Sequence, residues 1–161
     1  MEDSVDRHLA RWRGKAPFDE RTEGIVTRMQ ALVKHLSHTK EAALREVGIQ
    51  DYEFDTLHRL VARDGSATPS ELAGDLLLSP AGMTGRLDTL ERSGLVRRVR
   101  SAEDRRRVDV ELTAKGKHLW TDAMSICAEV ENGLVRTLTP ADQVRLDGLL
   151  KQLLVWMESD R

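Results

Sequence analysis

Two helix start signals in close succession, at Thr68 and Ser79, constrain this chain more than any other feature. The Thr68 hydroxyl can accept a hydrogen bond from an early helical N–H, while the Glu71 carboxylate reaches back to the Thr68 backbone. Pro69 follows at the first helical position, where its missing N–H matters least. Ser79-Pro80 repeats the signal. The sequence therefore predicts two short consecutive helices joined by a tight turn.

The second of these helices has one apolar side and one side of small or polar residues. Met83, Leu87 and Leu90 recur at i, i+4 and i+7 and are expected to face inward. Ser93-Gly94 then supplies a left-handed C-cap that ends the helix. Small residues near its start let the backbone come close to another surface. The outward side comprises Ala81, Gly85, Asp88, Thr89 and Arg92, with Thr84 and Arg86 flanking.

After Gly94 the hydrophobic period changes from helical to alternating. Leu95, Val96 and Val99 begin one strand, and a second strand is expected from Arg106 to Leu112. Residues 79–107 contain eight arginines against four acidic residues, in a chain whose formal net charge is -2. Arginine suits bidentate contacts to phosphate or guanine. Two short helices followed by a basic strand pair predict a winged helix-turn-helix that places one helix in the major groove of DNA.

These motifs resemble the MarR family of bacterial transcription regulators. The resemblance lies in LAGDLLLSPAGMTGRLDTLERSGLV and in the wing EDRRRVDVELTAKG, where Asp104-Arg105-Arg106 precedes Leu112-Thr113-x-x-Gly116. It implies a sequence-specific regulator of double-stranded DNA, with a wing that enters the minor groove or grips phosphates. Asp104 is expected to hold a neighbouring arginine in place. The candidate DNA-binding residues are Ser79, Ala81, Gly82, Thr84, Gly85, Arg86, Arg98, Asp104, Arg105, Arg106 and Arg107.

The fold class expected is mainly α with a small β-wing. Residues 1–161 form a single MarR-like domain, in which 49–116 are the winged helix-turn-helix lobe and 1–48 and 117–161 are a helical dimerisation region. The last helix, from Pro140 to Met157, is apolar on more than one face and needs a second partner. A homodimer, which the resemblance also implies, predicts a palindromic operator.

Composition excludes several other classes. Aromatic residues make up 4% of the chain, which disfavours single-strand binding by base stacking. No apolar run is long enough for a membrane span, and the first residues lack a signal-peptide core. A single cysteine indicates a reducing compartment, so a cytoplasmic location is expected. Without a nucleophile–base pair, a phosphate loop or a metal-ligand cluster, we expect no enzyme activity, no cofactor and no metal.

A second resemblance concerns the effector. Trp12 and Asp55 are similar to residues of the urate-responsive branch of the MarR family, where a Trp, an Asp and two Arg form a pocket between frame and lobe. Ala62 and Val99 stand at the two arginine positions here, which argues against urate itself. We still predict that the chain is a repressor, and that a small anionic aromatic or heterocyclic ligand releases it from DNA. The candidate residues that bind this ligand are Trp12, Asp55, His58 and Arg59.

Alternatives remain open at this stage. Asp55 and Arg59 can form an i,i+4 ion pair instead of lining a pocket. The wing arginines can serve a winged-helix module that binds an acidic protein. A regulator of the same fold can respond to metal, through His35 and His38 with Glu41 or His58, or to oxidation at Cys127. Cys127 lies on the apolar stripe of a helix, which favours a buried structural thiol.

Overall fold

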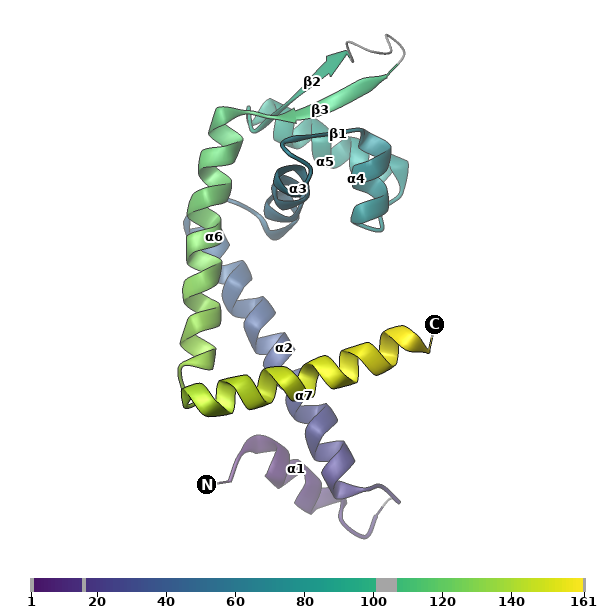
Figure 1. Ribbon diagram of the computed structural model, residues 1–161, viewed down its shortest axis with the longest axis vertical. Coiled ribbons are helices and arrows are strands. Elements are labelled where there is room, and N and C mark those ends of the chain that lie inside the picture. The colour runs from purple at the N-terminus through teal and green to yellow at the C-terminus, as the bar shows by residue number, and fades with distance from the viewer. Residues whose placement is uncertain (1, 16, 101–106, 161) are drawn as a thin grey trace.

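The computed structural model describes residues 2–15, 17–100 and 107–160. Figure 1 shows a lobe formed by α3, α4, α5 and a small sheet at one end, joined through the long helices α2 and α6 to a frame that includes α1 and α7. The predicted fold class, mainly α with a small β-wing, is confirmed. The elements in chain order are α1 (Ser4–Trp12), α2 (Glu20–Glu46), α3 (Asp51–Ala62), β1 (Ser66–Ala67), α4 (Pro69–Asp75), α5 (Pro80–Arg92), β2 (Val96–Arg100), β3 (Val108–Leu112), α6 (Ala114–Val135) and α7 (Pro140–Ser159).

Side-chain caps start the helices of the lobe where the sequence predicts them. Thr68 Oγ1 accepts from the Glu71 backbone N–H at 3.2 Å, and Thr68 N donates to Glu71 Oε2 at 2.7 Å. Ser79 Oγ accepts from Gly82 N at 3.1 Å. Each cap satisfies an N–H that lacks a partner inside its helix. Thr68 and Ser79 therefore fix where α4 and α5 begin.

The sheet has three antiparallel strands in the order β1-β3-β2. The register pairs Val96 with Leu112 and Arg100 with Val108. The sequence did not predict β1, because two residues are too few to show alternation. β1 covers β3 only at Val110 and Glu111, so Val110 is fully buried while Val108, farther along the ribbon, is 41% exposed. Arg106, where the second strand was expected to start, lies outside the described residues.

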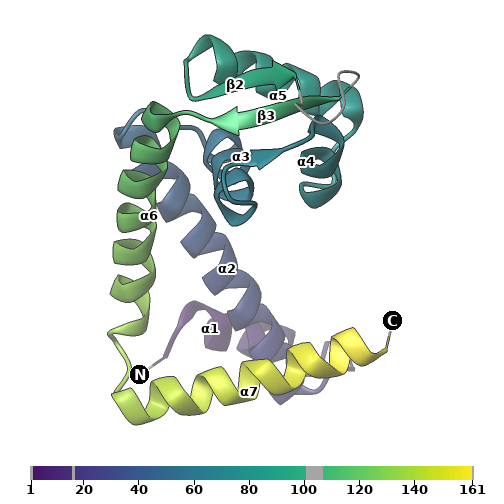
Figure 2. The ribbon, with the colours of Figure 1, turned by 45° about the horizontal axis from the view of Figure 1, so that its top comes forward.

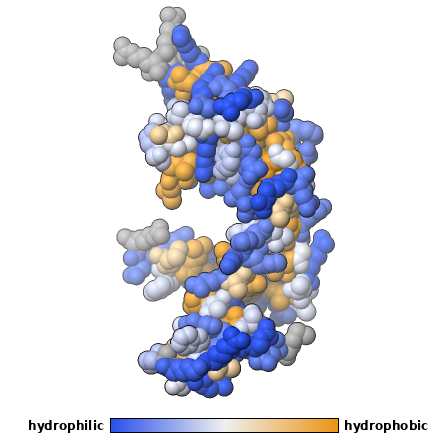
Figure 3. All heavy atoms as spheres, turned by 180° about the vertical axis from the view of Figure 1, so that it is seen from behind, coloured by the Kyte–Doolittle hydropathy of each residue, from blue (hydrophilic) through white to orange (hydrophobic). Residues whose placement is uncertain are grey.

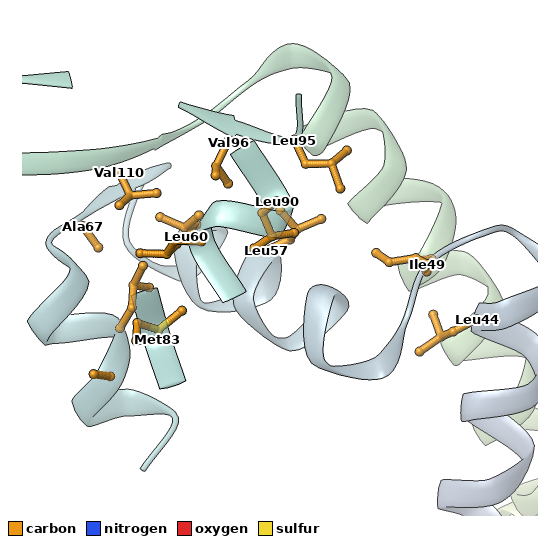
Figure 4. Packing of buried hydrophobic residues seen from close by; sticks show 14 of the residues in the cluster. Leu44, Ile49, Leu57, Leu60, Ala67, Met83, Leu90, Leu95, Val96 and Val110 are labelled. Carbon is orange, nitrogen blue, oxygen red and sulfur yellow. The ribbon is translucent and has the colours of Figure 1, made fainter. Parts of the chain in front are cut away.

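The main hydrophobic core fills the lobe. Met83, Leu87 and Leu90 are fully buried, as their spacing predicts. Figure 4 shows residues of this cluster from α3, α5 and the sheet, and the cluster continues through Ile49 and Leu44 toward the long helices. Burial of one side of α5 against this core fixes the orientation of its other side.

α6 joins the lobe by a close backbone contact. A side chain at Gly116 would place its Cβ 2.1 Å from the Leu95 carbonyl oxygen, so only glycine fits at this point. Thr113 Oγ1 donates to Gly94 O at 2.8 Å and accepts from Gly116 N at 3.0 Å. The first turn of α6 is thus attached to the segment that links α5 with β2.

α7 leaves the end of α6 as a projecting arm (Figures 1 and 2). Its first turn is held by Gln143, whose Nε2 donates to the carbonyl oxygens of Val135 and Leu138 at 3.2 Å each. None of its residues is buried. The exposed large apolar side chains of α7 are Val144, Leu146, Leu149, Leu150, Leu153, Leu154, Val155, Trp156 and Met157.

Candidate nucleic-acid interface

The first two turns of α5 project from the lobe. Ala81, Gly82, Thr84 and Gly85 are all exposed, because the opposite side of the helix is buried in the core. Ser79, also exposed, caps the helix. A helix that presents its N-terminal residues in this way can enter the major groove of DNA.

Arg86 does not share this outward orientation. It is half-buried, and its guanidinium carbon lies 5.3 Å from the centroid of the Tyr52 ring of α3, in a cation–π contact. The positive charge of Arg86 also interacts with the Asp55 carboxylate of α3. Partial desolvation and the neighbouring Asp51 raise the pKa of the Asp55 carboxyl, and the positive charge of Arg86 opposes that rise. Arg86 therefore links α5 to α3.

Arg98 holds α5 against β2 in this structure, and its expected contact with DNA stays a prediction. Its Nη1 donates to Glu91 Oε2 at 2.6 Å, and its Nη2 lies 2.7 Å from Asp88 Oδ1. Its backbone N–H also donates to Glu91 Oε1 at 2.9 Å. That backbone bond and the guanidinium lower the pKa of Glu91, against the effect of burial. The half-buried Arg98 thus ties the C-terminal half of α5 to β2.

Ion pairs also engage other arginines of the basic segment. Arg97 Nη2 lies 2.6 Å from Glu111 Oε2 across β2 and β3, and Arg107 Nε lies 2.7 Å from Asp109 Oδ1. Arg92 and Arg100 are exposed. The wing residues Asp104, Arg105 and Arg106 lie outside the described residues, so their roles stay predictions. Part of the local positive charge is therefore matched within the lobe.

The candidate effector residues Asp55, His58 and Arg59 lie close together on α3 but differ in solvent exposure. Asp55 and Arg59 are exposed, and among the described residues no ion pair joins them. His58 is half-buried and accepts a hydrogen bond on Nδ1 from Trp120 Nε1 of α6, at 3.2 Å. The His58 ring also contacts Phe54. His58 therefore connects the lobe to the frame.

Within one chain α1 does not bring Trp12 to these residues, so the predicted pocket that combines Trp12 with Asp55 stays a prediction. Trp12 lies on α1 beside His8 and Phe18, and Arg28 of α2 holds α1 in place through Asp3 and Asp6. The 27 residues of α2 separate this end from α3. At 1.5 Å per residue such a helix is about 40 Å long.

The contacts of the aromatic residues Tyr52 and Trp120 were not predicted from the sequence. Both lie on helices whose periodicity was recognised, but no local spacing indicates that Tyr52 meets Arg86 or that Trp120 meets His58. These contacts join residues far apart along the chain. Only the packing of α3 against α5 and α6 brings them together.

The structure also bears on the metal and redox alternatives and on the search for a membrane span. Within residues 2–15, 17–100 and 107–160, no group of three His, Cys, Asp or Glu side chains is arranged to hold a metal ion. Cys127 is 4% exposed, and burial raises the pKa of its thiol, opposite to what a reactive cysteine needs. Across the same residues, no helix has the length and apolar character of a membrane span.

Comparison with known proteins agrees with the winged lobe. Residues 51–108 match the model of the MarR family. The chain is 36% identical over 85 residues to the HTH-type transcriptional repressor YetL of Bacillus subtilis, covering 52% of this chain and about half, 51%, of YetL. It is 30% identical over 105 residues to the uncharacterized HTH-type regulator YhbI of the same organism, covering 63% of this chain and 68% of YhbI. The chain belongs to the MarR family.

A solved MarR-like structure shows the same architecture. MepR, described as a transcription regulator of the Staphylococcus aureus multidrug efflux pump MepA, superposes with a TM-score of 0.71 at 25% identity. The match covers 80% of this chain and 95% of MepR. Together with the family match, it identifies the lobe as the winged helix-turn-helix of a MarR-family regulator.

We expect Arg98→Ala to lower the free energy of unfolding by about 1–3 kcal/mol at pH 7, because it leaves the Glu91 and Asp88 carboxylates without their partner. The pKa of Glu91 is lowered from 4.5 in the fold, so its contribution is present above that value and lost as the pH falls through the folded pKa. Urea denaturation at pH 7 and near pH 3, at fixed protein concentration, measures both effects.

Arg97→Ala is the matched control for Arg98→Ala. It breaks an ion pair on the same strand, but the Arg97 side chain is 66% exposed. Exposed pairs contribute about 0–1 kcal/mol. Equal losses in the two variants at pH 7 would contradict the positioning role of Arg98.

Proposed function

We propose that this chain acts as a homodimer that binds a palindromic duplex, with α5 in the major groove and the wing beside it. The exposed, capped N-terminal half of α5 on a winged lobe is the observation that carries this proposal. The wing grips phosphates or enters the minor groove, and Asp104 positions a neighbouring arginine. The proposed contacts are Ser79, Ala81, Gly82, Thr84, Gly85 and Arg86 on α5, Arg98 on β2, and Asp104, Arg105, Arg106 and Arg107 on the wing.

Residues 1–48 and 117–161 form the proposed dimerisation frame. A large apolar surface stays exposed in the single chain, which favours a second copy as its partner. This surface comprises the arm α7 and the side chains of Ile25, Val26, Leu32 and Val33 on α2. Figure 3 shows hydrophobic side chains on the surface of the arm below the lobe. A two-fold dimer through these faces sets two copies of α5 about 34 Å apart, one turn of duplex DNA.

The proposed regulation is repression relieved by a small anionic aromatic molecule. YetL, the relative with the higher identity of the two described, is named a repressor. Arg59 gives the exposed face of α3 a positive charge, next to Asp55 and the half-buried His58. Because Trp12 is remote within one chain, it contributes to such a pocket only from the second subunit.

The switch follows from the separation of the two α5 helices. A ligand that binds more tightly to a dimer with the wrong separation shifts the population away from the DNA-binding form. A displacement of a few ångströms prevents both helices from docking in successive major grooves. Linkage requires that DNA weaken ligand binding by the same factor.

Binding to duplex DNA across a salt series tests the DNA-binding proposal. We expect submicromolar binding to a selected palindromic duplex at low salt, with an affinity that falls steeply as salt rises, because each neutralised phosphate releases about 0.9 counterion. Fluorescence anisotropy measures the slope. A flat salt response, or binding of an acidic protein in place of DNA, would favour a winged-helix module for protein contacts.

Sedimentation tests the dimer. The parent chain is expected to sediment as a dimer at micromolar concentration. Leu154→Asp places an unpaired charge in the proposed interface and should weaken association by several kcal/mol. Gln152→Asp, on another side of the same exposed helix, is the control and should stay dimeric. A monomeric parent would refute the interface.

Titration of the DNA complex with urate, salicylate and related phenolic acids tests the effector. We expect at least one of them to release the duplex, and Asp55→Asn and Trp12→Phe to shift the concentration needed by tenfold or more. Arg11→Gln, on the helix that carries Trp12, is the control and should leave that concentration unchanged. The pocket should be abandoned if no compound releases DNA and Asp55→Asn alters only stability.

A further inference from the structure

The surface that α5 offers to DNA carries no long side chain over its first two turns. Ala81, Gly82 and Gly85 are exposed and end at a methyl group or at the backbone. A Cβ built at Gly85 meets no atom within 4 Å, so packing does not demand glycine there. Glycine is the least helix-favouring residue after proline. The fold therefore gives no reason for Gly85.

Most polar side chains near this surface already have a partner within the lobe. Thr84 Oγ1 donates to Pro80 O at 2.9 Å, and Thr89 Oγ1 donates to Gly85 O at 3.2 Å. Arg86, the one long basic side chain of these turns, stacks on Tyr52. Asp88 is paired with Arg98. Apart from the Ser79 hydroxyl at the N-cap, the groups left to face base edges are the Ala81 methyl, the Thr84 methyl and the backbone at the two glycines.

A surface of methyl groups and bare backbone is suited to contact the methyl groups of thymine in the major groove. Arginine or lysine reads guanine by hydrogen bonds to O6 and N7, which requires a long side chain, whereas alanine and threonine methyl groups contact the C5-methyl group of thymine. Glycines also allow the helix backbone to approach the bases closely. Resting on the DNA-binding function proposed above, we propose that α5 reads its half-site through thymine methyl groups and close backbone fit, not through hydrogen bonds to guanine.

Modified duplexes test the thymine contact. A site selected from random duplexes should carry thymine in both half-sites. Deoxyuridine in place of a contacted thymidine removes only the methyl group, and should weaken binding about fourfold, the factor for burial of one methylene-sized group. Replacing half-site guanines by 7-deazaguanine removes the N7 acceptor and should change affinity less than twofold.

Two substitutions in the protein test the same methyl contact from the other side of the interface. Ala81→Gly deletes the alanine methyl, and Thr84→Ser deletes the threonine methyl while keeping the hydroxyl that donates to Pro80 O. In the double variant the thymidine-to-deoxyuridine ratio should fall to about one. Thermal melts of the variants show whether the fold is retained. A ratio unchanged from the parent would overturn the methyl contact.

Gly85→Ala tests the close approach. Its new methyl group meets open space in the free protein, so the melting temperature should rise while affinity for the selected site falls at least tenfold. Gly74→Ala on α4, where a Cβ also meets nothing within 4 Å, is the control and should raise the melting temperature without loss of binding. Parent-like binding by Gly85→Ala would overturn the backbone fit.

The outcomes separate the two levels of the proposal. If the parent chain binds no duplex at any salt, the DNA-binding function itself fails. If it binds a selected duplex tightly but ignores deoxyuridine and loses tenfold or more with 7-deazaguanine, the function stands and the thymine reading is wrong.

Discussion

Burial of one side of α5 is the constraint on which the rest of this structure depends. Met83, Leu87 and Leu90 are fully enclosed by the lobe core, and this interaction fixes the rotation of the helix about its axis. Rotation by one residue would turn these side chains by about 100° and expose part of the stripe. The outward position of Ala81 and Gly85 follows directly from this burial. The surface available to DNA is thus set by the core.

A second set of contacts fixes the position of the lobe relative to the frame helices α2 and α6. Gly116 brings α6 against the Leu95 carbonyl, and Trp120 of α6 donates to His58 of α3. Lys40 of α2 pairs with Glu131 of α6 farther along the frame. Because α6 contacts the lobe at several points, a change in the angle between frame helices moves α5 with it. That geometry is what an effector-dependent separation of two recognition helices requires.

Local signals predicted most of this fold. The caps at Thr68 and Ser79, the apolar spacing of α5 and the Gly94 turn depend on neighbouring residues, and each agrees with the structure. The short β1 gave no such signal, because a two-residue strand is defined by its partner β3 and not by its own pattern.

The candidate site was less predictable for the same reason. The sequence placed the exposed small residues of α5 correctly on its outer side. It did not indicate that Arg98 pairs with Glu91 and Asp88, or that α1 leaves Trp12 far from Asp55 within one chain. The environment of Arg98 depends on Glu91 and Asp88 across the junction of α5 with β2. The distance of Trp12 depends on the length of α2. Both are tertiary properties that residue type and spacing along the chain do not report.

Several arginines of the basic segment already have partners within the lobe, and this affects how much they can contribute to DNA binding. Arg97, Arg98 and Arg107 are in ion pairs within the lobe, and Arg86 stacks on Tyr52. An arginine that already faces a carboxylate neutralises a phosphate only after that pair is broken, so it releases fewer counterions than a free one. Counting arginines in the sequence therefore overstates the electrostatic part of binding. The proposed reading of thymine methyl groups by the small residues of α5 would supply shape and apolar contacts in place of that electrostatic share.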